Sequence, residues 1–301
     1  MSAVLRTNTE FERYSSSLVD ARCAFVEKEK VPIPNMYSFK SLLTALTAYS
    51  IAGAALAQTA SDNFENNNPG AAYNDGISYG DNGGIGFGAL TYLEGTGGGL
   101  FDAGLSGARA LGVFAGGGGG NTQALGRSLN SSLTTGSFTL QARFDLNNFV
   151  AFSGFNLKSG LGAGFGANEL LSFGLTPGSG NAALFLGGAA NQTLTLSGVT
   201  ELRGVNLDIL IDFDTAAATY TFNAKRTIDV SYSSISGSLK DTNGGAAGTG
   251  SVAAVGIGNF NTGSGQNLVA DNITAVPEPT SVALLSLIAG ASLLGRWRRV
   301  A

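Results

Sequence analysis

The chain has 301 residues, 13% of them charged and 44% hydrophobic, with 45 glycines, one cysteine and no histidine. This composition is too apolar for a disordered protein. Without histidine, Ser-His-Asp and Cys-His catalytic sites and the usual zinc sites are excluded. A pair of carboxylates, the apparatus that hydrolyses glycosidic bonds, remains open.

An export signal is predicted near the start of the chain. From Met36 a short basic segment leads into an apolar run, Leu42 to Leu56, which closes on the small-residue pattern of Ala55 and Ala57. These are the parts of a secretory signal peptide. Residues 36–57 are therefore predicted to form a signal helix, with cleavage after Ala57.

Residues 1–35 precede this signal and contain Cys23, the only cysteine. We expect translation to begin at Met36, with residues 1–35 an artefact of start-codon assignment. An unusually long leader and an internal membrane helix are the alternatives. If Cys23 is absent from the exported chain, no disulfide can stabilise it, and stability must come from a hydrophobic core.

The segment between the signals, 58–275, has 218 residues, which is enough for one all-β domain. It carries 8 lysines and arginines against 15 aspartates and glutamates, a formal charge of −7. That balance argues against nucleic acid or anionic lipid as a partner of the folded part. Neutral glycans and cations remain open as ligands.

Apolar and polar residues alternate with the period of a half-buried strand in two clear stretches, 137–146 and 205–214. The second is followed by a turn at 215–218 and another short strand at 219–224, which predicts a hairpin. No amphipathic helix is predicted between the terminal signals. Further candidate strands are 193–197, 227–233, 251–260 and 268–276.

Many short strands with one apolar face must bury that face against a second sheet. The predicted fold is all-β, an antiparallel two-sheet β-sandwich of the jelly-roll type, between an N-terminal signal helix and a C-terminal hydrophobic helix. Residues 62–65 and 271–273 are expected to lie on neighbouring strands. In pattern and length the domain resembles concanavalin-like lectin and glucanase sandwiches, a resemblance that implies a fold and not a function.

The glycine-rich segment 66–121 is expected to form glycine loops that join strands, including a flexible loop at Gly116–Gly120. Gly84–Ala89 and Gly162–Ala167 both fit a loose Gly-x-Gly-x-x-Ala pattern. Neither follows a strand, opens a helix and precedes an acidic residue at the required distance, so a dinucleotide site is not predicted. Gly97–Asp102 resembles a calcium-binding nonapeptide, but it misplaces a glycine and does not repeat.

Three aspartates, Asp208, Asp212 and Asp214, share one face of the predicted strand 205–214. They could form paired carboxylates or a set of Ca²⁺ ligands, or they could be the solvated face of an amphipathic strand. No other cofactor is predicted. Tyrosines could stack on sugars or could be ordinary sandwich residues, and the candidates are Tyr73, Tyr79, Tyr92 and Tyr232.

The last 26 residues begin with Val-Pro-Glu-Pro-Thr at 276–280 and continue into an uncharged apolar run, Ser281 to Gly295. The prolines keep the entry to this run extended. Its 15 residues fall short of the roughly 20 that a full membrane span needs. Three arginines then act as a membrane stop on the cytoplasmic side, and they are Arg296, Arg298 and Arg299.

This tail, 276–301, resembles the PEP-CTERM sorting signal of Gram-negative bacterial envelopes. In that family the recognition element corresponds to Pro277, Glu278 and Pro279, and a membrane protease-transpeptidase, exosortase, cuts near it. The resemblance implies that the secretion machinery exports the protein, that the inner membrane holds it transiently, and that it is then delivered to the cell surface or extracellular matrix. An ordinary membrane anchor is the alternative.

Two functions follow. The first is a non-catalytic surface protein with a structural or adhesive sandwich, a partner of exosortase and of extracellular polysaccharide. The second is a secreted carbohydrate-binding or carbohydrate-active domain, with glycoside hydrolysis left open and the three aspartates as its site.

Overall fold

The computed structural model describes seven ranges of the chain, all of them between Ala60 and Glu278. The described residues are 60–65, 73–116, 122–147, 150–177, 182–240, 250–261 and 266–278. Several predicted features lie outside them, namely residues 1–59 with Ala55 and Ala57, most of the Gly116–Gly120 run, Pro279, the apolar run 281–295 and the arginines Arg296, Arg298 and Arg299. Within the described ranges, no helix is long and apolar enough to cross a membrane.

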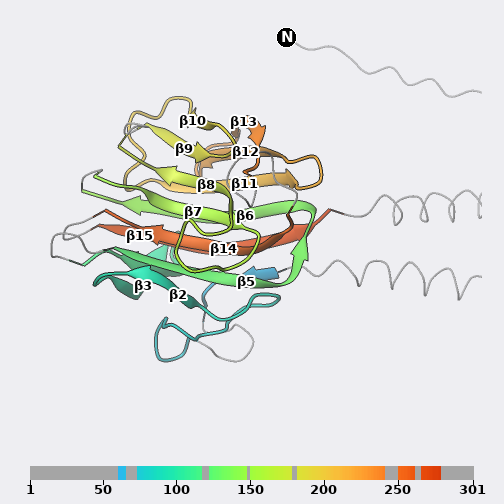
Figure 1. The fold of residues 1–301 in the computed structure, drawn as a ribbon. Helices are drawn as coiled ribbons and strands as arrows, with labels where there is room; N and C mark the ends of the chain where they lie inside the picture. Colours follow the sequence, from blue (N-terminus) through green and yellow to red (C-terminus); the bar gives the residue numbers. More distant parts are fainter. Residues whose placement is uncertain are drawn as a thin grey trace, which may run out of the picture. The chain divides into compact units, whose positions relative to one another are not determined.

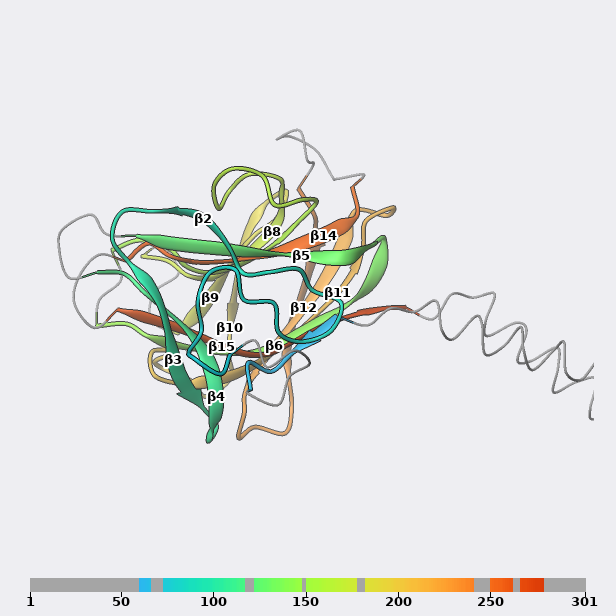
Figure 2. The same ribbon diagram turned by 90° about the horizontal axis from the view of Figure 1, so that it is seen from below.

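The domain is a sandwich of two antiparallel sheets, seen edge-on as two layers in Figure 2. The eight-stranded sheet has the order β13-β12-β11-β6-β15-β4-β3, with β1 paired to β15. Its strands are β1 (Ala60–Asp62), β3 (Gly99–Leu105), β4 (Ala108–Phe114), β6 (Thr135–Asp145), β11 (Asn206–Asp214), β12 (Thr219–Arg226), β13 (Ser233–Ser238) and β15 (Asn267–Pro277).

The seven-stranded sheet has the order β10-β9-β8-β7-β14-β5-β2 (Figure 1). Its strands are β2 (Thr91–Gly95), β5 (Gln123–Leu133), β7 (Ser153–Lys158), β8 (Glu169–Leu175), β9 (Ala183–Gly187), β10 (Asn191–Thr195) and β14 (Val252–Asn259). The two-sheet antiparallel sandwich expected from the sequence is confirmed.

The core lies between the sheets, because each sheet turns one apolar face inward. Strands β6 and β11 show strict alternation of buried and half-buried residues, as their sequence pattern requires. Aromatic rings interlock across the layers: Phe144 packs edge-on against Phe155 at 6.4 Å, and Phe222 meets Phe173 at 5.3 Å. Burying such rings from both sheets is what makes the sandwich stable.

Several strand predictions are confirmed. The hairpin of β11 and β12 turns at the expected residues, and β14 and β15 match the two C-terminal candidates. The first and last strands are neighbours, with Asp62 paired to Ile273.

The strand predicted at 227–233 is wrong. Arg226 and Asp229 form a two-point ion pair, with Nε and an Nη donating at 2.8 and 2.7 Å, and this pair closes a turn. The turn leaves Ile228 and Val230 82% and 95% exposed, and β13 begins only at Ser233.

Within residues 66–121, expected to be glycine loops that join strands, no individual strand was predicted. This stretch contains β2, β3 and β4, and β3 and β4 are a tight hairpin in full register from Gly99 paired with Phe114 to Leu105 paired with Ala108. Main-chain pairing within the sheet compensates for the low strand propensity of glycine.

Candidate functional site

The aspartate row of β11 lies on the outward face of the eight-stranded sheet, opposite its buried apolar residues. Asp208 accepts a hydrogen bond from Gln141 Nε2 at 3.0 Å and lies 3.6 Å from Lys225 Nζ. Asp212 accepts a hydrogen bond from Ser137 Oγ at 2.6 Å. Each carboxylate therefore has its own cross-strand partner.

The third aspartate, Asp214, caps the turn after β11, where its Oδ1 accepts two backbone N–H groups at 2.9 Å. A strand rises about 3.4 Å per residue, so Asp208 and Asp212 are separated by roughly 13 Å along β11. In the described ranges, no group of three or more acidic, cysteine or histidine side chains could hold a metal ion. The row does not converge on one point, and it does not fit a Ca²⁺ ligand set.

The tyrosines divide into two kinds. Tyr73 is fully buried, contrary to a role in sugar stacking, and its hydroxyl donates to Asp62 Oδ2 at 2.5 Å. Burial raises the pKa of Tyr73 well above its usual value. Tyr79 and Tyr92 form an edge-on pair at 5.6 Å and are 38% and 50% exposed, and Tyr232 is 43% exposed.

A different surface, the outer face of the seven-stranded sheet, has the features of a site. All six residues of β7 are buried, so this face is covered as well as the inner one. The register brings five glycines onto it from four neighbouring strands. We call them the glycine floor: Gly126 of β5, Gly154 of β7, Gly174 of β8, and Gly256 and Gly258 of β14.

The loop between β7 and β8, residues 159–168, covers part of this floor and is called the flap (Figure 1). Its base is closed by Ser159 N–H donating to Asn168 O at 2.9 Å, as in compact loops whose ends lie close together. A Cβ atom added at Gly258 would lie 2.8 Å from the Phe165 ring, and one at Gly126 would lie 2.7 Å from Leu161. The flap can lie here only because the floor has no side chains.

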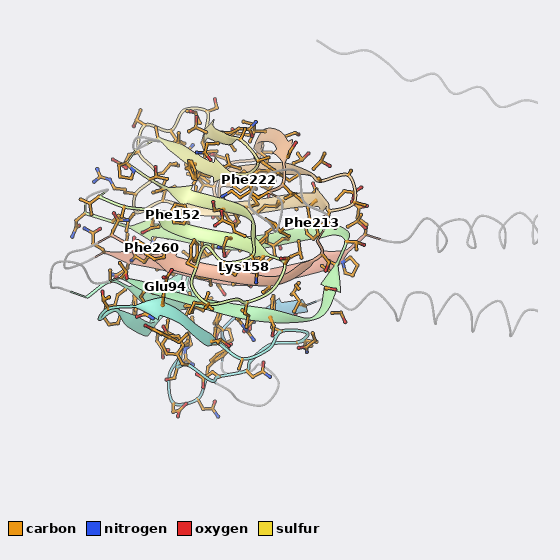
Figure 3. All side chains as sticks on the ribbon, viewed as in Figure 1. Glu94, Phe152, Lys158, Phe213, Phe222 and Phe260 are labelled. Carbon is orange, nitrogen blue, oxygen red and sulfur yellow. The ribbon has the colours of Figure 1, made fainter. Side chains whose placement is uncertain are left out.

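Three side chains hold the flap through its main chain. Lys158 Nζ donates to Phe165 O at 2.5 Å and to Gly164 O at 3.3 Å, and Asn156 Nδ2 donates to Phe165 O at 2.6 Å. On the other side, Glu94 Oε1 accepts Phe165 N–H at 2.8 Å. Lys158 belongs to β7 and Glu94 to β2, and both residues are labelled in Figure 3.

Lys158 is completely buried, and burial lowers the pKa of its ammonium group, while the charges of Glu169 and Glu94 act in the opposite direction. Its ammonium also lies 6.0 Å from the centre of the Phe165 ring. Beside it, Asn156 Oδ1 is buried without a hydrogen-bond partner among the described residues. A buried cation next to an unsatisfied acceptor is unusual in a purely structural strand.

The other Gly-x-Gly-Phe-Gly-Ala segment, Gly84–Ala89, covers a second buried cation. The guanidinium of Arg127 lies 4.8 Å from the centre of the Phe87 ring, and Arg127 Nε donates to Gly88 O at 2.9 Å. Arg127 also forms a fully buried ion pair with Asp62. This group of contacts is completely satisfied, which is typical of a structural role.

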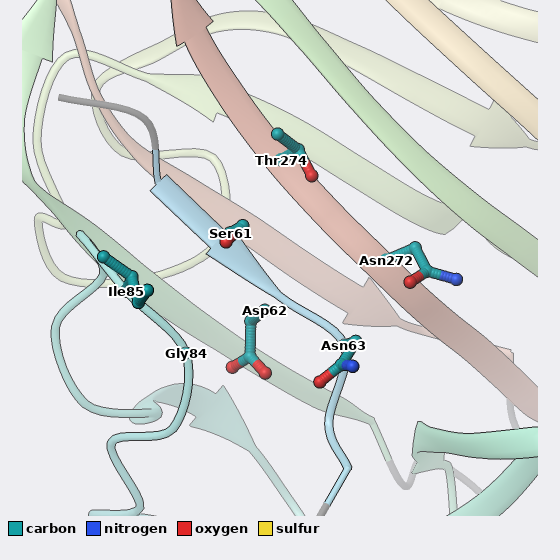
Figure 4. Close-up of a pocket in the computed structure, with 7 residues that line it drawn as sticks. All are labelled: Ser61, Asp62, Asn63, Gly84, Ile85, Asn272 and Thr274. Carbon is teal, nitrogen blue, oxygen red and sulfur yellow. The ribbon is translucent and has the colours of Figure 1, made fainter. Parts of the chain in front are cut away.

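Next to that segment is a pocket of about 180 Å³ (Figure 4). It lies beside buried Asp271, whose pKa is raised to about 6, mainly by burial. Ordinary ligand pockets have volumes of about 300 Å³ or more, so this pocket is too small for a sugar chain. Its lining residues are Ser61, Asp62, Asn63, Gly84, Ile85, Asn272 and Thr274.

Two residues of the predicted sorting element are described. Pro277 is the last residue of β15, paired with Gly136, and Glu278 is exposed immediately beyond it.

Neither the glycine floor nor Lys158 was predicted from the sequence. A usable signal was present, because Gly154, Asn156 and Lys158 alternate on one strand and Gly256 and Gly258 on another. Glycine repeated at every second position of a strand marks a face where another segment approaches closely.

No protein-family model matches the sequence, and no curated protein matches it. Solved structures that resemble the fold include the galactose complex of lectin UEA-II, with 9% identity and a TM-score of 0.42 over 62% of this chain and 92% of that one. Arcelin-5 from Phaseolus vulgaris has 8% identity and a TM-score of 0.41 over 73% and 98%. The calreticulin globular domain of T. cruzi has 9% identity and a TM-score of 0.43 over 72% and 95%. At this level the likeness assigns no family, ligand or activity to the chain.

Proposed function

We propose that this is an exported protein of the cell surface or extracellular matrix, sorted by a PEP-CTERM-type signal at its C-terminus. One observation carries the proposal: strand β15 ends where the sorting element begins. Pro277 closes β15, and Glu278, the next residue, is exposed. A membrane protease would thus meet its recognition element directly at the edge of the sandwich.

The strand before that element is protected from cleavage. β15 lies inside its sheet, paired with β6 along most of its length, with β4 at Asn267–Ala270 and with β1 at Ile273–Ala275. It contributes Leu268 and Ile273 to the core. Cutting within β15 would require the sheet to open, so processing is confined to the residues after Pro277.

The sandwich itself serves as non-catalytic cargo with a structural or adhesive role. The outward carboxylates of β11 are each engaged by neighbouring groups, so the row supplies no pair of free carboxylates facing each other. The predicted signal peptide at 36–57 and the basic end of the chain provide export and transient retention in the inner membrane.

Cell fractionation of sorting-element variants tests this proposal. In a host with exosortase, a variant with Pro277→Ala and Glu278→Ala is expected to remain in the inner membrane, while the wild type reaches the surface. Asp75→Ala, which removes an exposed carboxylate far from β15 in the sequence, is the matched control and should sort normally. Normal surface delivery of the double variant would refute the sorting assignment.

A second candidate function is carbohydrate binding by the sandwich. It is favoured by the outer face of the seven-stranded sheet, where the aromatic rings of Phe152, Phe185 and Phe260 are only half-buried. Phe152 and Phe185 are 6.3 Å apart and edge-on to each other. Aromatic faces with a few polar groups beside them are a common composition for a ligand site.

A further inference from the structure

The slot that the flap fills has an apolar floor and aromatic walls. Phe165 of the flap inserts between Phe152, at 5.7 Å, and Phe260, at 5.3 Å, over the bare backbone of Gly258. The two wall rings stay half-buried, whereas Phe165 is 6% exposed. If the flap lifts, it leaves a flat glycine floor between two phenylalanine rings.

The polar groups of the slot are satisfied mainly by the main chain of the flap. Among the described residues, the hydrogen-bond acceptors of Lys158 Nζ are the carbonyl oxygens of Gly164 and Phe165. Asn156 Nδ2 donates to the same Phe165 oxygen and, at 3.4 Å, to Glu169 Oε2, and its own Oδ1 has no partner in the described ranges. Lifting the flap would therefore free the Lys158 ammonium from both its acceptors and leave Asn156 Nδ2 with Glu169 alone, beside an acceptor that is already unsatisfied.

Two features allow the flap to move as a unit. Gly162 and Gly164 adopt φ of 58° and 89°, left-handed values that glycine reaches without strain, and Asn168 at the base has φ of 57°. Of the ten flap residues, four are exposed, five are half-buried and only Phe165 is buried, so its ring is the anchor of the flap.

We propose that the slot beneath the flap is a binding site for a linear, uncharged sugar chain, which enters as the flap lifts. This inference rests on the second candidate function and gives it a location. The C–H face of a hexose ring would cover the glycine floor and contact Phe152 and Phe260. Its hydroxyl groups both donate and accept, so they would meet the amide of Asn156 and the ammonium of Lys158 together.

The charges of the slot favour an uncharged ligand. Glu169 forms an ion pair with Lys240, and Glu94 carries the charge opposite to that of Lys158 within the same slot. Neither a cation nor an anion would gain a net electrostatic attraction there. A peptide could use the same hydrogen bonds, as the flap itself does, and is therefore an explicit arm of the test.

Binding is measured by calorimetry with the full chain in detergent micelles. The probes are six-residue linear oligomers of glucose, mannose and galactose, and the peptide Gly-Ala-Gly-Phe-Gly-Ala. Phe165→Ala removes the anchor of the flap and should tighten the binding of at least one sugar by tenfold or more, because apparent affinity scales with the open fraction. Gly166→Ala is the matched flap control, because its added Cβ would contact nothing within 4 Å.

Two changes to the slot should abolish the gain. Added to Phe165→Ala, Lys158→Met removes the donor, and Gly258→Leu refills the floor, so each should weaken sugar binding by at least tenfold. The proposal is overturned if no oligomer binds Phe165→Ala, if only the peptide binds, or if sugar binding survives both changes. In that last case carbohydrate binding stands and only its location is wrong, and none of these outcomes bears on sorting through the tail.

Discussion

Two copies of the sequence Gly-x-Gly-Phe-Gly-Ala cover two buried cations, and they are held in different ways. In both Gly84–Ala89 and Gly162–Ala167, a phenylalanine ring lies near the cation and main-chain carbonyl oxygens accept its hydrogen bonds. At Arg127 a buried carboxylate, Asp62, completes the arrangement. At Lys158, among the described residues, no carboxylate lies within ion-pair distance, and burial disfavours the charge.

The difference indicates which cover can open. Asp62 also accepts hydrogen bonds from Phe64 N–H and the Tyr73 hydroxyl, so releasing Gly84–Ala89 would expose an interlinked set of buried charges. Releasing the flap would return the Lys158 ammonium, whose charge is disfavoured by burial, to water. The same short sequence is thus a fixed cover over Arg127 at Gly84–Ala89 and a movable cover over Lys158 at Gly162–Ala167.

The largest expected effect comes from breaking the fixed cover. Arg127→Met should lower the free energy of unfolding by about 3–5 kcal/mol, because it leaves the carboxylate of Asp62 buried without its cation. Urea unfolding measures the change. Arg143→Met, which removes a half-exposed pair with Asp145 at 2.8 Å, is the control and should cost less than about 1 kcal/mol. Equal losses in the two variants would show that the buried pair has no special role.

A second test uses Asp271, beside the fixed cover. Burial and the negative charges of Glu65 and Asp62 raise its pKa to about 6, from 3.8, against the opposing effect of Asn272 N–H. The folded state therefore binds a proton on the Asp271 carboxylate more strongly than the unfolded state does. The stability that this proton contributes is complete below about pH 4 and is lost as pH rises to about 6.

The loss amounts to about 2–3 kcal/mol at about 1.4 kcal/mol per pKa unit. Asp271→Asn should remove this loss, because asparagine does not titrate. The unfolding free energy of the variant minus that of the wild type should therefore increase between pH 4 and pH 7. The exposed Asp75→Asn serves as the control. A difference that stays constant over this range would contradict the assignment.

A third, smaller effect is expected at the movable cover. Lys158→Met should leave stability unchanged or raise it by about 1–2 kcal/mol, because it removes the cost of burying an ammonium group. In the wild type, the lowered pKa means that unfolding takes up a proton, so stability should rise with pH from the lowered pKa up to 10.5. Melting temperatures at pH 7 and pH 10 check both points, and a marked destabilisation by Lys158→Met would contradict the contrast with Arg127.

The last prediction concerns local opening in the wild-type protein. Native-state hydrogen exchange should be at least tenfold faster for the N–H of Phe165, which is bonded to Glu94, than for the N–H of Gly88, which is bonded to Ser128 O at 2.8 Å. Equal protection at the two sites would mean that both covers are fixed.

The fold could be predicted where side chains alternate clearly. The regular patterns in 137–146 and 205–214 identified β6 and β11. The expected neighbouring strands near the termini are confirmed where Asp62 pairs with Ile273. The alternation of Ile228 and Val230 predicted a strand at 227–233, but both residues are exposed beside a turn that the ion pair of Arg226 and Asp229 closes. Local pattern cannot detect an ion pair that closes a turn.

The candidate site could not be predicted, for a related reason. The aspartates of β11 were visible as a row, but their cross-strand partners Gln141 and Ser137 come from the neighbouring strand β6, over 60 residues away. The glycine floor is assembled from four strands and becomes a surface only once their register is known. Lys158 is a single lysine in an apolar strand, and its role in holding the flap depends on the loop that folds back over it.

If the sandwich is cargo for a signal that begins at its last strand, intact mass spectrometry of the surface-released protein should show where the chain is cut. The expected chain starts at Gln58, keeps all of β15 through Pro277 and ends at or just beyond Glu278, without the apolar run 281–295. A released chain that retains Trp297 and its neighbouring arginines, or one that ends inside β15, would contradict it.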